Sequence, residues 1–374
     1  MRSTCAYLWV VFFLAAVRVS AQAQVIKTAI DRINSYTNMR YLQAEHQKSP
    51  FTDDWSTLNY KATTSYNSQR DSLELFNYYD TRGYQSVYNG NLMMTLDIRE
   101  KTYRTTAGKS NGMYYTPYYW ARFMKAMLAL PVTQVKIMSD TVIAKTPCLH
   151  IARVLANTPG DRSITDLYLD KKTYLPVLVK QLMQGHMGKG NMVDDKVTTM
   201  ITESRYTNYK TNFKGLDITA FTIPVNFSAE KKAALLPAGT KAPDWTLKSL
   251  TDATVSAGNL KGKVILLDFS FNECAACMLS IPTLNKLHEK YKDDNVAIVT
   301  INTSNTKESV ARFVKKNNIR YSILLKGSGV SRSFSVSAYP TFILIDKQGN
   351  IAASFEGTSK TLENELIAGI DKLK

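Results

Sequence analysis

Two cysteines, Cys274 and Cys277, form the feature that most constrains this chain, because they stand where an apolar run gives way to a helical pattern. Residues 264–269 are apolar except for Asp268, which is typical of a buried strand. At the start of a helix, free amide N–H groups and the helix dipole stabilise a thiolate. We therefore expect Cys274 to attack as a thiolate and Cys277, one turn further on, to resolve a mixed disulfide.

The length of 374 residues indicates two domains rather than one. The chain opens with Arg2, an apolar run over residues 6–17 and the small-residue sequence Ala21-Gln22-Ala23, which together are typical of a secretory signal. The apolar run is too short to span a bilayer. The sequence thus predicts that residues 1–23 are removed and that the protein is exported to the periplasm or cell envelope.

Three cysteines remain once Cys5 leaves with the signal, and only Cys274 and Cys277 are close in sequence. One close pair in an exported protein of this size indicates exchange chemistry or metal binding rather than a disulfide-stabilised scaffold. A structural zinc site would need a second ligand pair at suitable spacing, and the sequence has none. The third cysteine, Cys148, shares a strand face with His150 and is expected in a core.

The chain is strongly basic, with a formal net charge of +16 from 47 Lys and Arg against 31 Asp and Glu. These basic residues are spread out rather than run together, and no nucleic-acid motif accompanies them. A diffuse basic surface favours solubility or contact with anionic lipid or polysaccharide, so we expect no nucleic-acid partner.

The N-terminal part combines a leading helix with many alternating strands. Near-helical spacing of apolar residues predicts a helix over residues 24–43, and a second helix is expected over residues 118–130. Alternation predicts strands over residues 58–66, 73–79, 84–88, 92–98, 134–138, 141–154, 166–170, 177–183 and 197–206, with Asn89-Gly90 as a hairpin turn. This pattern favours a large, strongly curved, mainly antiparallel β sheet.

Residues 167–177, 206–209 and 217–224 of this part resemble segments of the lipoprotein-carrier-like open barrels of the LolA/LolB type. The resemblance implies a β domain over residues 24–230 that forms a curved sheet or half-barrel. It also implies a concave apolar cavity able to hold a hydrophobic ligand such as an acyl chain, or a protein segment. The alternative is a scaffold that only positions or dimerises the rest of the chain.

A linker is expected over residues 231–237 and a second domain over residues 238–374. Residues 239–247, 258–263 and 338–349, together with the cysteine pair, resemble the thioredoxin-like disulfide reductases of the TlpA/ResA type. This resemblance implies an α/β thioredoxin-like fold and an extracytoplasmic thiol-disulfide oxidoreductase that reduces disulfides of envelope proteins. No cofactor site is visible in the sequence, so this role implies an upstream membrane thiol reductase as electron donor.

The same resemblance assigns roles to individual residues. Asp268 takes the place of a buried carboxylate whose raised pKa lets it shuttle the proton of the resolving cysteine, the alternative being a solvated residue at the strand end. Pro340 matches a cis-proline that packs against the disulfide, the alternative being a trans proline that begins an edge strand. Tyr339 would pair its backbone with a substrate peptide. Pro282 matches the kink proline of the family's active-site helix.

Three positions depart from the family pattern. Asn272-Glu273 stands where a Trp is usual, Ala275-Ala276 lacks the common proline, and Ser280 stands where some of these reductases carry Glu. Glu273 lies on the expected docking surface beside Cys274, where its charge should raise the pKa of the thiol. The sequence therefore leaves open whether the cysteine pair acts as a reductant or as an oxidant.

A binding-protein interpretation also stays open, in which the N-terminal sheet holds a lipid or peptide and the cysteine pair is a structural or redox-sensing disulfide. Peroxidase chemistry is disfavoured, because no Pro-led loop with a Thr precedes Cys274. Met183, His186, Met187 and Met192 could together bind copper(I), although such a run is more often a hairpin tip.

Overall fold

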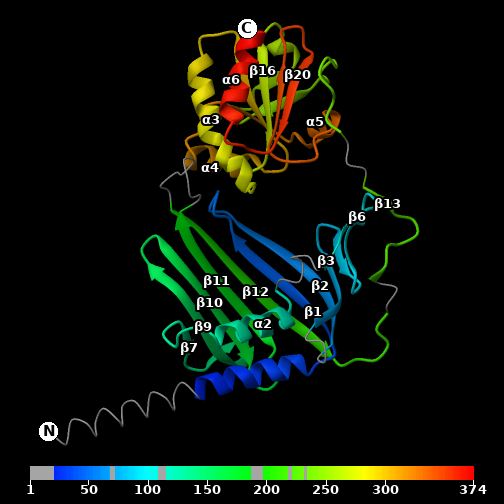
Figure 1. Ribbon diagram of the computed structural model, residues 1–374, viewed down its shortest axis with the longest axis vertical. Helices are drawn as coiled ribbons and strands as arrows, with labels where there is room; N and C mark the ends of the chain where they lie inside the picture. Colours follow the sequence, from blue (N-terminus) through cyan, green and yellow to red (C-terminus); the bar gives the residue numbers. More distant parts are fainter. Residues whose placement is uncertain (1–20, 68–71, 108–114, 187–196, 218–220, 231–233) are drawn as a thin grey trace, which may run out of the picture. The chain divides into compact units, whose positions relative to one another are not determined.

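The structure is a computed structural model that describes residues 21–67, 72–107, 115–186, 197–217, 221–230 and 234–374 (Figure 1). Its contacts divide the chain into two compact units. The first unit comprises Met1–Pro50 and Trp55–Glu230, and the second comprises Phe51–Asp54 and Lys231–Lys374. No helix in the described part of the chain is both long enough and apolar enough to cross a membrane.

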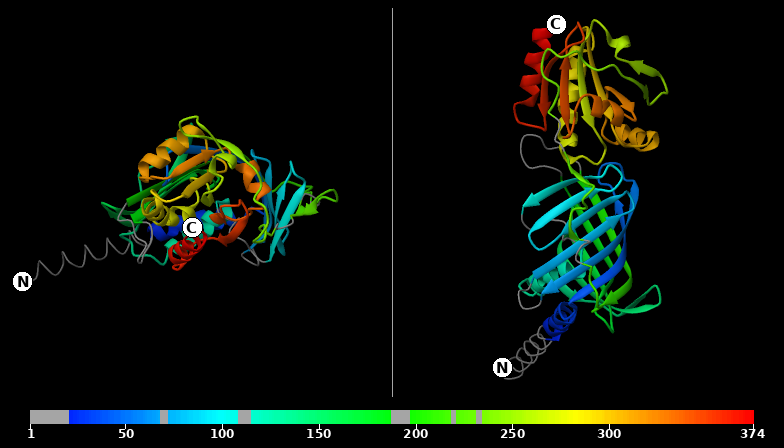
Figure 2. Two further views of the ribbon diagram at one scale, coloured as in Figure 1. Left: turned by 90° about the horizontal axis from the view of Figure 1, so that it is seen from above. Right: turned by 90° about the vertical axis from the view of Figure 1, so that its right-hand side faces the viewer.

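The first unit is built on one curved sheet of 13 strands (Figures 1 and 2). The strands are β1 (Asn38–Lys48), β2 (Trp55–Asn67), β3 (Ser72–Asp80), β4 (Tyr84–Tyr88), β5 (Leu92–Asp97), β6 (Thr102–Ala107), β7 (Val135–Ile137), β8 (Thr141–Ile143), β9 (Thr146–Thr158), β10 (Asp161–Asp170), β11 (Pro176–His186), β12 (Val197–Thr211) and β13 (Ser228–Ala229). Their order is β13-β6-β5-β4-β3-β2-β1-β12-β11-β10-β9-β7, and β8 pairs with β9. Within the described residues β7 and β13 do not pair with each other, so the sheet is not a closed barrel.

Strand pairing in this sheet is antiparallel, with one exception, the short parallel contact between β13 and β6. Two helices pack against the sheet, one over residues 21–34 and α2 (Pro117–Met127). Ile26 and Ile33 of the first helix and Trp120 and Met124 of α2 share one hydrophobic core with strand residues. The mainly antiparallel architecture predicted from alternation is therefore confirmed.

The predicted helix over residues 24–43 is wrong beyond residue 34, because β1 begins at Asn38. Met39, Tyr41 and Gln43 are buried while Arg40 and Leu42 between them are exposed, which is the period of a strand. Pairing with β2 on one side and β12 on the other supplies the backbone hydrogen bonds of this segment. Tertiary pairing thus overrides an apolar spacing that also fits a helix.

The predicted single strand over residues 141–154 is also wrong, because it is two strands, β8 and β9, that pair with each other. Ala144 and Lys145 connect them with φ angles of 48° and 70°. Two successive residues with positive φ form the tight turn that matches the twist of a hairpin.

The second unit is an α/β structure (Figure 2). Its sheet has seven strands in the order β15-β14-β18-β17-β16-β19-β20. The strands are β14 (Thr246–Ser249), β15 (Thr254–Ser256), β16 (Val264–Ser270), β17 (Val296–Asn302), β18 (Ser322–Leu325), β19 (Thr341–Ile345) and β20 (Ile351–Glu356). The helices are α3 (Ala275–Tyr291), α4 (Lys307–Lys316), α5 (Ser328–Ser333) and α6 (Leu362–Leu373). Strands β16, β17 and β18 run parallel, and β19 runs antiparallel to β16.

Strand β16 is the centre of this unit and is buried along its whole length. Val264 and Leu266 pack into the cluster that contains residues of α3 and α6. Ile265, Leu267 and Phe269 pack into a second cluster that contains no residue of these two helices among those the structure describes. Because the sheet carries a core on each face, its central strand is apolar at successive positions rather than alternating. This explains why residues 264–269 form an apolar run.

Candidate active site

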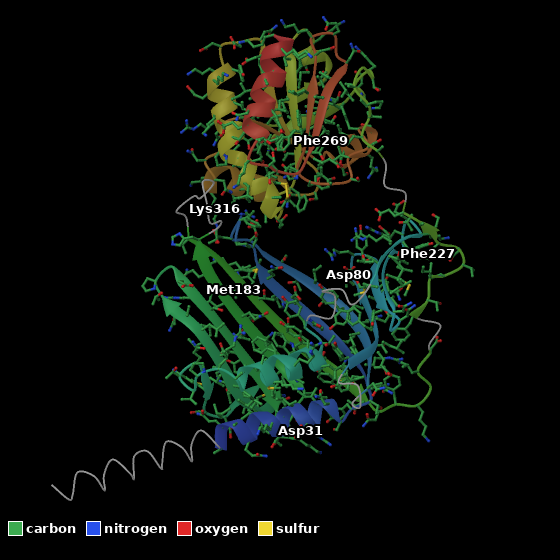
Figure 3. The ribbon with its side chains drawn as sticks, in the orientation of Figure 1. Asp31, Asp80, Met183, Phe227, Phe269 and Lys316 are labelled. Atoms are coloured by element: carbon green, nitrogen blue, oxygen red, sulfur yellow. A yellow bond between two sulfur atoms is a disulfide. The ribbon has the colours of Figure 1, made fainter. Side chains whose placement is uncertain are left out.

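The cysteine pair lies at the junction of β16 and α3, as the sequence predicted. Cys274 is the N-cap of α3, and its Sγ accepts a hydrogen bond from the backbone N–H of Cys277 at 3.1 Å. The two cysteines form a disulfide with Cα atoms 5.2 Å apart, drawn as a yellow bond in Figure 3. A sulfur held by a helix amide at the positive end of the helix dipole is stabilised as a thiolate once the disulfide is reduced.

Asp268 is a buried carboxyl group on β16, with an exposure of 2%. Thr300 Oγ1, on the adjacent strand β17, donates a hydrogen bond to Asp268 Oδ2 at 2.6 Å. Oδ1 has no hydrogen-bond partner among the residues that the structure describes. Burial raises the pKa of Asp268 to about 7, although the Thr300 hydrogen bond acts in the opposite direction. The predicted burial is confirmed, and the solvated alternative is wrong.

The peptide bond between Tyr339 and Pro340 is cis, as predicted, and the trans alternative is wrong. Pro340 is buried and directly precedes β19. Because Thr341 pairs with Phe269, the cis peptide lies beside the end of β16 from which the cysteine segment leaves. The Tyr339 ring lies edge-on to Phe271, with ring centroids 5.4 Å apart, and its hydroxyl lies 2.8 Å from Ser331 Oγ. The backbone N–H and C=O of Tyr339 make no hydrogen bond within the described chain.

An asparagine network that the sequence did not predict holds the segment between β16 and α3. Asn272 is fully buried and accepts a hydrogen bond from Asn302 Nδ2 at 3.0 Å. Its own Nδ2 donates to Ser309 Oγ at 3.0 Å, and its backbone N–H donates to Asn305 Oδ1 at 2.8 Å. The end of β17 and the start of α4 therefore fix the backbone just before Cys274. Asn302 is the last residue of β17 and Asn305 lies three residues beyond it, and neither position points to Asn272 as a partner in the sequence.

The network ends at Glu273, which is exposed. Asn305 Nδ2 donates a hydrogen bond to Glu273 Oε2 at 2.8 Å. The carboxylate next to Cys274 is therefore anchored, although it faces solvent.

Loss of the Asn272 side chain is expected to lower the free energy of unfolding by about 1–3 kcal/mol, because Asn272→Ala removes its two side-chain hydrogen bonds, to Asn302 on β17 and to Ser309 on α4. Urea denaturation of the full chain would measure the change. Asn295→Ala is the matched control, since the exposed Asn295 side chain donates one hydrogen bond, to the Gly262 carbonyl, and its loss should cost less than about 1 kcal/mol. Equal losses in the two variants would contradict a structural role for the network.

Comparison with known proteins places this site in a family. Residues 237–368 match the Redoxin family. The chain is 31% identical over 149 residues to the thiol-disulfide oxidoreductase ResA of Bacillus cereus, an alignment that covers 39% of this chain and 85% of that protein. The chain belongs to the ResA-type thiol-disulfide oxidoreductases.

Other relatives of this ResA-type protein agree. It is 31% identical over 144 residues to the thioredoxin-like protein YneN of Bacillus subtilis, covering 38% of this chain and 84% of the relative. Among solved structures, a putative thiol:disulfide interchange protein DsbE from Chlorobium tepidum aligns with 37% of this chain and 98% of that chain, at 26% identity and a TM-score of 0.36. The matches to ResA, to YneN and to the Redoxin family show that the ResA-type protein is a thioredoxin-like thiol-disulfide oxidoreductase, and they confirm the fold predicted for its C-terminal part.

Ser280 and Pro282 of this ResA-type protein both lie on α3. Ser280 is buried, and its hydroxyl donates to the Cys277 carbonyl at 2.8 Å, so it stabilises the first turns of α3. Pro282 lies inside α3 and is exposed. The Ser280 hydroxyl is therefore hydrogen-bonded to the backbone of α3.

The remaining candidates lie on the first unit. Cys148 is a buried free cysteine on β9, and burial raises the pKa of its thiol, which disfavours the thiolate. His150 stacks on Tyr168 and lies 2.7 Å from Asp166 Oδ1. Cys148 itself has an exposure of 0%, as predicted for a core residue.

The run of methionines and a histidine that the sequence left open as a copper(I) site is only partly described. Met183 and His186 lie on β11, whereas Met187 and Met192 lie outside the described residues. Within those described, no group of three or more His, Cys, Asp or Glu side chains is arranged to hold a metal ion.

Proposed function

We propose that this protein is an extracytoplasmic reductase that uses the Cys274–Cys277 dithiol to reduce disulfides of envelope proteins. The observation that carries the proposal is the position of Cys274 at the N-cap of α3, where its sulfur accepts a helix N–H. This geometry makes Cys274 the more stable thiolate of the pair and therefore the attacking group. Family membership supports the reaction class.

The proposed cycle transfers two electrons. The Cys274 thiolate attacks one sulfur of the substrate disulfide, so that a Cys274–substrate bond forms and the other substrate sulfur leaves as a thiolate that takes a proton. The Cys277 thiolate then attacks Cys274 Sγ, which releases the second substrate sulfur and closes the Cys274–Cys277 disulfide. Asp268 accepts the proton of Cys277 as it becomes a nucleophile, a role supported by burial and by a pKa of about 7.

Substrate binding is assigned to Pro340, Tyr339 and Glu273. The free backbone groups of Tyr339 are suited to pair with an extended substrate segment, and Pro340 fixes their direction beside the end of β16. The exposed Glu273 carboxylate completes the docking surface next to Cys274.

The cycle leaves the protein oxidised, so turnover requires an electron donor. The proposed donor is a membrane thiol reductase of the envelope, which fits export of the chain after removal of residues 1–23. The proposed domains remain residues 24–230, a linker over residues 231–237 and the thioredoxin-like domain over residues 238–374.

A second candidate function is binding of a lipid or a peptide by the first unit, with the disulfide structural or redox-sensing. The open, curved sheet favours it, and a cavity of about 410 Å³ lies among β2 to β6. This cavity is lined by three tyrosines, two arginines, an aspartate, a serine and a threonine. Nearby, the Tyr78 hydroxyl donates to Gln43 Oε1 at 2.7 Å and lies 2.6 Å from the Tyr41 hydroxyl. Such a lining suits a polar peptide segment better than an acyl chain.

The reduction potential of the cysteine pair tests the proposed direction of electron flow. Equilibration of the full chain in defined thiol–disulfide buffers is expected to give a midpoint near that of thioredoxin, about −270 mV. Cys148→Ser is the control, because the buried Cys148 should not affect the midpoint. A midpoint near about −120 mV would instead identify an oxidant. A cysteine pair that undergoes no thiol–disulfide exchange with the buffer would favour the binding function.

A further inference from the structure

Glu273 is an exposed carboxylate with a fixed position. Its Oε2 accepts the 2.8 Å hydrogen bond from Asn305 Nδ2, and it directly precedes Cys274. No lysine or arginine among the described residues forms an ion pair with it. Its negative charge is therefore available to whatever docks at the cysteine.

The orientation of the Asn305 side chain follows from its other hydrogen bonds. Asn305 Oδ1 accepts from the backbone N–H of Asn272 at 2.8 Å and from Asn302 Nδ2 at 3.2 Å. Two donors identify this atom as the amide oxygen, so the amide nitrogen must point the other way, toward Glu273. The backbone N–H of Asn305 donates to Asn302 Oδ1 at 2.9 Å, which fixes the residue from a third direction. Asn305, which anchors the carboxylate, is thus itself held by three hydrogen bonds.

A fixed carboxylate beside the attacking sulfur has two electrostatic effects, one on the Cys274 sulfur and one on the substrate. It repels negative charge on the Cys274 sulfur, which changes the reaction with every substrate by a common factor. It also attracts or repels charged residues of the substrate that flank the substrate cysteine, and this effect differs between substrates. Two unit charges at contact distance in water interact by about 1 kcal/mol, which corresponds to about five-fold in rate.

We propose that Glu273, held by Asn305, makes this site select substrate disulfides that carry lysine or arginine beside the cysteine. The proposal rests on the role of Cys274 as the attacking thiol. The formal net charge of the chain, +16, repels basic peptides at long range, so the local attraction by Glu273 works against the overall field. The effect of Glu273 must therefore be measured as a change between variants.

The test uses the reduced full chain and two disulfide-linked peptides that differ only in having Lys or Glu on both sides of the cysteine. In each reaction the protein dithiol becomes a disulfide and the peptide disulfide becomes two thiols. Stopped-flow measurement gives the ratio of the Lys-peptide rate to the Glu-peptide rate, in which any change of thiol pKa cancels. The ratio is expected to fall about 25-fold in Glu273→Gln at low salt, about five-fold from the lost attraction of the Lys peptide and about five-fold from the lost repulsion of the Glu peptide, and the difference should shrink toward 1 M salt.

Asn305→Ala should lower the ratio part of the way, because the carboxylate remains but loses its anchor. Glu289→Gln is the matched control, since Glu289 is an exposed carboxylate further along α3, paired with Lys292, and its removal should leave the ratio unchanged. A change below two-fold in Glu273→Gln, with both peptides reduced, overturns the selection proposal alone. Failure of the wild-type protein to reduce either peptide overturns the reductase function and the selection proposal together.

Discussion

Cys274→Ser is expected to reduce the rate of disulfide exchange by at least about 10³-fold, because a serine hydroxyl is not ionised near neutral pH and cannot attack a disulfide. Cys274 is the sulfur that accepts the hydrogen bond from the backbone N–H of Cys277, whereas Cys277 lies inside the first turn of α3. The loss should therefore appear in the first step, before any covalent complex forms. Stopped-flow reduction of a small disulfide by the reduced full chain would measure it.

Cys277→Ser is the matched control, because it keeps the attacking thiol and removes only the resolving one. This variant should still react once with a disulfide and then accumulate as a mixed disulfide through Cys274. Mass spectrometry under non-reducing conditions would identify the adduct and its site. If Cys277→Ser stays unmodified while Cys274→Ser forms the adduct, the two cysteines have the opposite roles.

The parts of the site that could be predicted from the sequence are those whose residues lie close together in the chain. The apolar run at residues 264–269, the cysteine spacing and Asp268 within the run lie within a few residues of one another. A strand buried on both faces must be apolar throughout, so the single acid in it is recognisable as an exception. The cis peptide before Pro340 was expected from a resemblance over residues 338–349, and it is present.

The asparagine network was not predictable, because its members meet only after folding. Asn272 and Asn302 are 30 residues apart and come together because β16 and β17 are adjacent parallel strands. In the sequence, Asn272 counted only as a departure from the family pattern. In the structure it is fully buried and holds the segment that carries Cys274. A polar residue without local partners gives no sequence signal of such a role.

The error at β1 has a different cause. Ile26, Ile30, Ile33, Tyr36 and Met39 are all buried, so the apolar spacing correctly identified residues that face the core. The spacing continues across the junction between a helix that ends at residue 34 and a strand that begins at Asn38. Pairing with β2, the next strand along the chain, and with β12, whose Thr211 pairs with Met39, decides that this segment is a strand. The lipoprotein-carrier resemblance of this unit stays a prediction.

Asp268→Asn is expected to slow disulfide exchange and to stabilise the protein at the same time. The variant cannot accept a proton from Cys277, so the resolution step at pH 7 should slow on the order of 10²-fold. The wild-type rate should rise as the pH passes through about 7, where Asp268 ionises, and this rise should be absent in the variant. Thr300→Val is the second variant, because losing the hydrogen bond that lowers the pKa of Asp268 should move the rise to higher pH.

The gain in stability follows from the direction of the pKa shift. The pKa of Asp268 is about 7 in the folded protein and near its ordinary value of 3.8 when unfolded. Between pH 3.8 and about pH 7, Asp268 is protonated in the folded protein and ionised in the unfolded one. The free energy of unfolding therefore falls as the pH rises through this range. Above pH 7 the buried carboxylate costs at most on the order of 4 kcal/mol, which Asp268→Asn removes, while below about pH 4 the two proteins should be equally stable. Urea denaturation at pH 4 and pH 8, with hydrogen exchange at β16 to follow the second unit, would measure both differences. A variant that loses stability at pH 8 would show that Asp268 is a structural acid rather than a proton carrier kept at a cost to the fold.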